Sequence, residues 1–154
     1  VVKQYEIAEK YLKPGELSAI KPVVEEFIKV DLDSLPHALV HGDLIATNVM
    51  KSENGEIYLL DFACSNWYPR IVELAILSGN LIRDFEIDWI LEAYDKFNPL
   101  TKLEKDLLPI FQKMAFVMCV VSAVRERDLY ANNSKENEYW LEQGLTGLGI
   151  KEEK

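Results

Sequence analysis

The feature that most constrains this fold is one short β-type region in a chain whose other segments have a helical pattern. Between residues 37 and 61 the pattern changes to short β-type runs, at 38–40, 49–51 and 57–60. Elsewhere, apolar spacing and breaker residues predict helices over residues 1–12, 16–30, 70–82, 85–97, 101–128 and 135–148. Residues 66–69 are expected to lie in a loop. The sequence therefore predicts a mostly helical α+β protein.

The length and composition indicate one compact body. The 154 residues are 49% hydrophobic, enough for a sizeable core, and they contain no internal repeat and no long linker. We therefore expect a single domain over residues 1–154. The 17 Lys and Arg residues are outnumbered by 26 Asp and Glu residues. The resulting charge of -9 would repel a phosphate backbone, so nucleic acid is not expected as a partner.

The apolar segments and the cysteines predict a cytoplasmic protein. The most apolar run, Met114 to Val124, is about half of the roughly 20 residues that span a bilayer, so we expect a buried helix and no membrane association. Cys64 and Cys119 are too few and too far apart for a disulfide framework, and no secretory signal precedes them.

The dipeptide Asn54-Gly55 predicts a β-hairpin between the last two β-type runs. It is the preferred pair for a two-residue type I′ turn, which requires positive φ at both central positions. A turn centred there pairs Met50 with Leu59. It also places Asn48 directly opposite Asp61 at the open end of the hairpin.

Polar residues at this open end suggest a metal site. Directly opposed residues have Cβ atoms about 5 Å apart on one face, so the Asn48 amide oxygen and the Asp61 carboxylate would converge on a cation. Mg²⁺ prefers such oxygen ligands and is usually held by one or two carboxylates together with substrate phosphates. Asp43, in the loop just before the hairpin, would then accept a proton from a hydroxyl that attacks a metal-bound phosphate. The alternative is that Asn48 and Asp61 are only the polar ends of a hairpin.

The order and spacing of these residues resemble a known catalytic core. His-Gly-Asp at residues 41–43 is followed by Asn48, by a hairpin and by Asp-Phe at residues 61–62. This pattern is similar to that of the aminoglycoside phosphotransferase and choline kinase family, which has the protein-kinase-like fold. The resemblance implies an ATP-dependent kinase that phosphorylates a hydroxyl of a small molecule.

The resemblance also implies a role for each residue of the motif. Asp43 would be the catalytic base, and Asn48 and Asp61 would be the Mg²⁺ ligands that also bind ATP through its phosphates. His41 would support the catalytic loop, a role that we prefer to metal ligation.

Two further segments carry the resemblance along the chain. Residues 68–75, Tyr-Pro-Arg-Ile-Val-Glu-Leu-Ala, look like the family's segment in which an aromatic residue and Arg precede an acidic residue, Leu and Ala. The acidic residue, here Glu73 in place of the usual Asp, would support the catalytic loop by accepting backbone N–H bonds. Residues 137–142 look like the family's last helix.

The resemblance covers residues 16–149, but only as the family's C-terminal lobe. The segment before His41 offers no glycine-rich phosphate loop and no strand-borne Lys, so the N-terminal nucleotide lobe is expected to be absent. We therefore expect a truncated piece that is inactive alone. The surface left by the missing lobe would favour a homodimer.

The acceptor is expected to be a small, amine-bearing molecule bound by the part of the chain that follows the hairpin. Acidic and aromatic side chains hold amines through charge and cation–π contacts, and the candidates are Trp67, Glu126, Asp128, Tyr139 and Trp140. The competing interpretation is that these aromatic residues are core and that the acidic residues face solvent.

Two other functions fit parts of the pattern. A non-catalytic, kinase-like binding or regulatory module is compatible with the missing lobe, although it predicts a lost base or metal ligand, and all three residues are present. A metal hydrolase built on His41, Asp43 and Asp61 would need further ligands. The other histidine, His37, precedes the strand.

Overall fold

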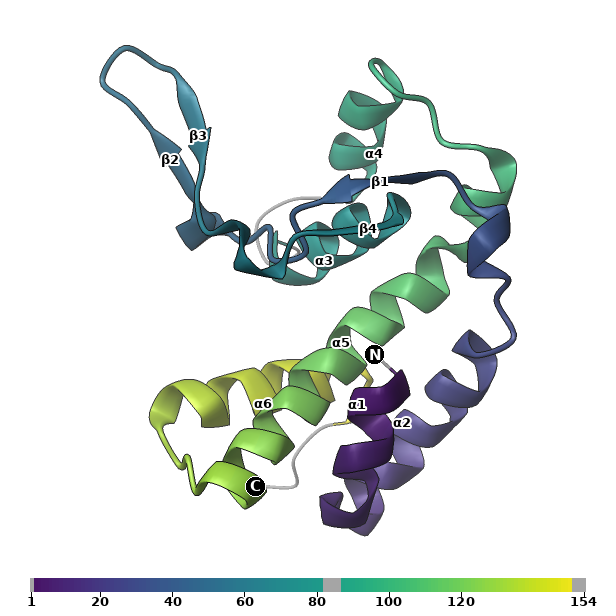
Figure 1. Ribbon diagram of the computed structural model, residues 1–154, viewed down its shortest axis with the longest axis vertical. Helices are drawn as coiled ribbons and strands as arrows, with labels where there is room; N and C mark the ends of the chain where they lie inside the picture. Colours follow the sequence, from purple (N-terminus) through teal and green to yellow (C-terminus); the bar gives the residue numbers. More distant parts are fainter. Residues whose placement is uncertain (1, 82–86, 151–154) are drawn as a thin grey trace. The chain divides into compact units, whose positions relative to one another are not determined.

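The computed structural model describes residues 2–81 and 87–150, and the chain forms two compact units (Figure 1). One unit contains Val1–Val30 and Lys113–Lys154, and the other contains Asp31–Gln112. The long helix α5, Lys102–Tyr130, contributes its first turns to the second unit and its remainder to the first. Helices dominate, and the strands are short, as the sequence predicts. The expectation of a single domain stays a prediction.

The first unit is helical throughout its described residues. It contains α1 (Val2–Ala8), α2 (Pro14–Phe27), the C-terminal part of α5, and α6 (Lys135–Gly147). Its core is made of apolar side chains from α2 and α5 that are nearly or completely buried, among them Ile20, Val24, Phe27, Val117, Val121 and Val124. A Cβ atom at Gly144 of α6 would lie 2.6 Å from Val120 Cγ2, so α6 packs closely on α5 at this glycine.

The second unit holds the β structure and the predicted site. Strand β1 (His37–Val40) pairs antiparallel with β4 (Asn66–Pro69), and β2 (Val49–Lys51) pairs antiparallel with β3 (Ile57–Leu59). Helices α3 (Ile71–Leu81) and α4 (Ile87–Asp95) follow. In Figure 1 the β2–β3 hairpin extends away from β1, β4 and α3.

The predicted loop at residues 66–69 is wrong, because this segment is strand β4. Val40 pairs with Asn66 and Leu39 with Trp67, so the backbone of the segment is held by β1. The partner strand is distant in the sequence, and Pro69 lies at the end of β4, where a missing N–H is tolerated. Pairing with β1 therefore outweighs the local turn signals.

The predicted hairpin exists, but its predicted register is wrong by one residue. Val49 pairs with Leu59 and Met50 with Tyr58. The Gly55 N–H donates to the Ser52 carbonyl at 3.0 Å, and Gly55, unlike Asn54, has positive φ, +86°. This is a three-residue connection, a turn followed by a left-handed glycine, and not a two-residue type I′ turn.

The helix predictions agree with α1 to α6 to within a few residues at the described ends. Residues 82, 85 and 86 of those predictions lie outside the described residues. Helix α5 is long and apolar enough to cross a membrane by length and composition, and half of its most apolar stretch is buried inside the protein. Core helices of soluble proteins have the same properties.

Candidate active site

The loop that connects β1 to the hairpin, residues 41–48, passes very close to the segment that follows Asp61. Gly42 has φ +80°, and a Cβ atom at this position would overlap the carbonyl oxygen of Cys64. Only glycine combines this backbone conformation with so close an approach. Gly42 therefore lets the 41–48 loop contact the chain just beyond the hairpin.

His41 connects the 41–48 loop to the end of the hairpin. Its side chain is buried, and its Nε2 lies 2.7 Å from the Leu60 carbonyl oxygen. Its Nδ1 accepts the Asp43 N–H at 3.3 Å, which assigns the proton of the neutral ring to Nε2. The ring also packs against Phe62, with centroids 4.6 Å apart. His41 therefore orients both the backbone of Asp43 and the residue before Asp61.

Asn48 holds the carboxylate of Asp43. The Asn48 Nδ2 donates to the Asp43 carbonyl oxygen at 2.8 Å and to Asp43 Oδ2 at 3.0 Å. The Asn48 N–H donates to the Ile45 carbonyl at 3.0 Å, which closes the turn between them. The structure gives no hydrogen bond from the described residues to Asp43 Oδ1. One carboxylate oxygen is thus held, and the other is available to a ligand.

Asp61 lies where the hairpin ends and the chain changes direction. It has φ 58°, in the left-handed region that residues other than glycine rarely adopt, and its Oδ1 accepts the Ala63 N–H at 3.3 Å. Such backbone conformations are concentrated at functional sites. The Leu60 N–H donates to the Asn48 carbonyl at 2.9 Å, so Asn48 lies opposite Leu60 and not opposite Asp61. The predicted direct pairing is wrong, although the two residues remain neighbours at the open end of the hairpin.

The donor set fits Mg²⁺. Asn48 Oδ1 and Asp61 Oδ2 are oxygen atoms to which no described residue donates a hydrogen bond, and Mg²⁺ requires oxygen ligands. Among the described residues, no group of three or more His, Cys, Asp or Glu could hold a metal ion. A site here would therefore need ligands from a substrate or from water in addition to Asn48 and Asp61, and a metal hydrolase built on His41, Asp43 and Asp61 gains no support.

Glu73 lies in the first turn of α3 and holds the beginning of the 41–48 loop. Its carboxylate accepts the His41 N–H through Oε2, and it accepts the Gly42 N–H at 3.3 Å through Oε1. Two neighbouring backbone donors thus share one carboxylate. The Glu73 side chain therefore reaches the loop backbone that the resemblance led us to expect it to support.

Sequence reasoning missed a buried ion pair near Glu73. Arg70 Nε lies 2.8 Å from Glu104 Oε1, and the two side chains are 11% and 0% exposed. The sequence signal that was available is the spacing from Thr101 to Glu104, which matches a helix-capping motif. That motif predicts the start of α5 but gives no sign that its Glu would face Arg70.

The candidate acceptor residues fall in both units. Trp67 lies on β4 of the second unit and is 66% exposed, whereas Glu126, Asp128, Tyr139 and Trp140 belong to the first. Tyr139 and Trp140 contact each other edge to face, with centroids 5.2 Å apart. Asp128 already pairs with its neighbour Arg127 at 2.7 Å. The charge of Asp128 is therefore partly neutralised within the chain.

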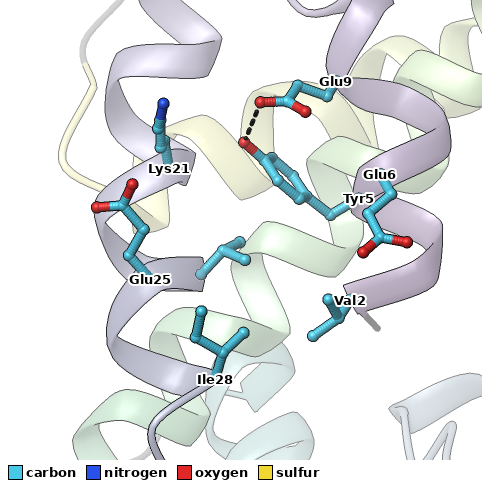
Figure 2. Close-up of a pocket in the computed structure, with 8 residues that line it drawn as sticks. Val2, Tyr5, Glu6, Glu9, Lys21, Glu25 and Ile28 are labelled. Carbon is cyan, nitrogen blue, oxygen red and sulfur yellow. Dashed lines mark hydrogen bonds between the residues drawn. The ribbon is translucent and has the colours of Figure 1, made fainter.

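A cavity of about 210 Å³ lies away from all of the predicted site residues, between α1 and α2 (Figure 2). Tyr5 donates to Glu9 at 2.9 Å on its wall. Burial, together with the nearby Glu9 and Glu25, raises the pKa of Tyr5 to about 12. Glu6, Glu9, Glu25 and Ile28 at its rim are all exposed, so the cavity is a surface groove.

Comparison with known protein families identifies the family of this chain. The model of the phosphotransferase enzyme family matches residues 2–100, which include all of the 41–48 loop, the hairpin and Glu73. The chain therefore belongs to the phosphotransferase enzyme family. No match was found among curated proteins.

A solved structure of similar fold is an ethanolamine kinase from Plasmodium vivax. It is 14% identical to this chain, with a TM-score of 0.58, and the match covers 96% of this chain and 47% of the other. The chain thus spans about half the length of that kinase. The likeness shows a similar fold.

Proposed function

We propose that this member of the phosphotransferase enzyme family is the C-terminal lobe of a small-molecule kinase that transfers the γ-phosphate of ATP to a hydroxyl. The single observation that carries the proposal is the Asp43–Asn48 pair. One oxygen of the Asp43 carboxylate is held at 3.0 Å by Asn48 Nδ2, and the other has no partner among the described residues. A carboxylate that is oriented but still available is what a base for an incoming hydroxyl requires.

The residues around Asp43 would act by positioning. His41 accepts the Asp43 N–H, and Glu73 accepts the N–H groups of His41 and Gly42. Phosphoryl transfer depends mainly on alignment and on stabilisation of charge, so a rigid loop matters more than a strong base. Asp43 would orient the acceptor hydroxyl and take up its proton as the bond from its oxygen to the γ-phosphorus forms, while the bond from that phosphorus to the bridging oxygen breaks and ADP leaves.

Asn48 and Asp61 would hold Mg²⁺ together with the phosphates of ATP. Bound Mg²⁺ would neutralise the charge on the transferring phosphoryl group. Asn48 would then act at two points, because its Nδ2 holds Asp43 and its Oδ1 would be a ligand for the metal. With only two protein ligands, the chain alone would bind the metal weakly, and this supports our expectation that it is inactive without a nucleotide lobe.

The acceptor would be a small, amine-bearing alcohol, such as the ethanolamine in the name of the structurally similar kinase. Trp67 supports this proposal because the residue is 66% exposed on β4, which pairs with the strand that precedes the 41–48 loop, and a cation could stack on its ring. The roles of Glu126, Tyr139 and Trp140 are proposed on chemical type alone. Asp128 is a weaker candidate because Arg127 already pairs with it.

The exposed β2–β3 hairpin supports a second part of the proposal, a surface through which two copies of this chain associate. Every residue of β2 and β3 is exposed, and most of them are apolar, with Ile57 60% exposed. Exposed apolar surfaces of this kind mark interaction sites. We propose that a homodimer forms here when no nucleotide lobe covers the hairpin.

Metal binding tests the proposal on the chain itself. Titration with Mn²⁺, followed by paramagnetic broadening of backbone resonances, should affect residues near Asn48 and Asp61 first. Asp61→Ala should abolish this selective broadening, while the matched control Asp33→Ala, at an exposed carboxylate of the same unit, should retain it. Identical broadening in Asp61→Ala would remove Asp61 from the metal site.

The exposed hairpin also favours one alternative, a kinase-like module that binds a partner and has no catalytic role. This alternative predicts that Mn²⁺ produces no selective broadening at residues 43–61, although the hairpin still self-associates. A phosphorylation assay with ethanolamine, choline, homoserine and an aminoglycoside, on a form that carries a nucleotide lobe, separates the two functions. The kinase should phosphorylate at least one of these acceptors, and the binding module should phosphorylate none.

A further inference from the structure

The buried pair of Arg70 and Glu104 joins three separate segments of the second unit. Arg70 follows β4, and its guanidinium donates to both carboxylate oxygens of Glu104, at 2.8 Å from Nε and 3.0 Å from Nη2. The guanidinium also donates to the Asn98 side chain through Nη1 and to the Pro99 carbonyl at 2.8 Å through Nη2. The planar guanidinium, whose donors have fixed directions, thus donates hydrogen bonds to three different residues.

Glu104 is equally constrained from its own helix. It accepts the Thr101 N–H at 2.8 Å and the Thr101 hydroxyl at 2.9 Å, and its own N–H donates back to that hydroxyl at 3.2 Å. Burial alone would raise the pKa of Glu104, but the hydrogen bonds from Arg70 and Thr101 outweigh burial and lower it. Glu104 is therefore a charged, fully buried residue that both caps α5 and anchors Arg70.

The backbone of Arg70 leads directly to the 41–48 loop. Its N–H donates to the Pro36 carbonyl at 3.0 Å, just before β1, and its carbonyl accepts the Glu73 N–H at 3.2 Å. Glu73 in turn holds the N–H groups of His41 and Gly42. Hydrogen bonds therefore connect Glu104 to the Arg70 side chain, the Arg70 carbonyl to the Glu73 N–H, and the Glu73 carboxylate to the His41 N–H.

We infer that Arg70 and Glu104 are positioning residues: together they fix the first turn of α3, and through Glu73 they set the backbone of the 41–48 loop at His41 and Gly42. Neither residue contacts Asp43 or Asn48. That the positioned loop is catalytic rests on the proposed function, but the positioning itself does not.

Nuclear magnetic resonance of the amide protons of His41 and Gly42 provides a direct readout. Amides that donate to a carboxylate make strong, charge-assisted bonds and resonate downfield, so Glu73→Gln should move both signals upfield and provides the reference for a lost carboxylate. Arg70→Lys keeps the charge but loses the fork. We expect it to move both signals toward the Glu73→Gln positions and to speed their hydrogen exchange by about tenfold or more relative to the Gly55 amide.

The matched control is Lys102→Met. It removes the exposed Lys102–Asp106 pair in the same first turn of α5, where the side chains are 89% and 57% exposed, and it should leave both amides unchanged. Glu104→Gln, which keeps the shape of the side chain, repeats the test without depending on Arg70→Lys. The inference is overturned if either variant leaves the His41 and Gly42 signals in place, or if neither variant folds, since the pair would then act on the whole unit. Failure of phosphotransfer would contradict the proposed function alone.

Discussion

The 41–48 loop and the β2–β3 hairpin are consecutive in the chain, but they are held in opposite ways. Groups from outside the loop fix it: the Glu73 carboxylate accepts two of its backbone N–H groups, and the Leu60 backbone carbonyl accepts from the buried His41 ring. The hairpin depends on its own ladder, and both of its strands are exposed throughout. The loop is therefore built for precise geometry, whereas the hairpin presents an apolar surface.

Two consecutive segments are thus held by different interactions. The loop backbone at His41 and Gly42 is positioned by charge-assisted hydrogen bonds to Glu73, which are directional. Most side chains of β2 and β3 are apolar, and the described residues leave them exposed. Substitutions in the two regions should therefore change different properties of the protein.

The largest effect is expected at Asp43. In a form with measurable phosphotransferase activity, Asp43→Asn should lower kcat by about 10² to 10⁴, the range for loss of a general base, and should change the KM for ATP little. Steady-state kinetics at saturating acceptor measure this. An unchanged kcat with a raised KM for ATP would make Asp43 a nucleotide or metal contact, and Asp33→Asn controls for the loss of one charge.

Breaking the buried pair should follow. Glu104→Ala leaves Arg70 charged and nearly buried, and removal of one partner of such a pair costs about 3 to 5 kcal/mol. Chemical denaturation followed by circular dichroism measures the loss. Asp106→Ala, which breaks the exposed pair with Lys102, should cost less than about 1 kcal/mol. Equal losses in the two variants would show that burial does not set the strength of the pair.

Two glycines compare the loop and the hairpin directly. Gly42→Ala adds a Cβ atom that overlaps the Cys64 carbonyl and strains a left-handed backbone, so we expect a loss of about 2 to 4 kcal/mol. Gly55→Ala places the same methyl group in open space at φ +86° and should cost only about 1 to 2 kcal/mol of strain. Thermal unfolding of both variants tests the difference. A larger loss at Gly55 would contradict the close contact at Gly42.

The pH dependence of stability should carry the signature of Glu104. Because its pKa in the folded state lies below the ordinary 4.5, the unfolded state binds more protons in that range, and stability should fall as the pH drops through 4.5 toward the folded pKa. Glu104→Gln should flatten this part of the profile. Denaturation midpoints between neutral pH and pH 3 measure it, and an unchanged slope would assign the acid sensitivity to other carboxylates.

The smallest effect on stability is expected in the hairpin. Ile57→Lys replaces a side chain that is 60% exposed, and such surface changes usually alter stability by less than about 0.5 kcal/mol. It should nevertheless reduce self-association, as measured by analytical ultracentrifugation. A wild-type chain that stays monomeric at high concentration would contradict the proposed homodimer.

The local pattern was sufficient to predict most of the secondary structure, and it singled out candidate site residues whose roles stay predictions. Helices such as α2 and α6 follow from apolar spacing and from capping residues such as Ser134, which accepts the Asn137 N–H. The hairpin was located correctly, but its register was not, because Asn-Gly is compatible with a three-residue connection as well as with a two-residue one. In the structure the three-residue connection is closed by hydrogen bonds from the Gly55 N–H to the Ser52 carbonyl and from the Glu56 N–H to the Ser52 hydroxyl.

Strand β4 was missed for a different reason. Its residues, which include Pro69, carry turn signals, and its strand conformation depends on pairing with β1, whose residues lie far away in sequence. The Arg70–Glu104 pair was missed in the same way. Neither the segment that contains Arg70 nor the capping motif that contains Glu104 predicts the pair, and only the fold brings the end of β4 to the start of α5.

The sequence by itself determined the helical class, the family and the positions of Asp43, Asn48 and Asp61, because these depend on residue types at fixed local spacing. The tertiary structure alone decided that residues 66–69 form a strand paired with β1 and that Arg70 pairs with the buried Glu104. The physical reason is that these contacts join segments distant in sequence. Their geometry depends on how buried polar groups find partners when the unit folds.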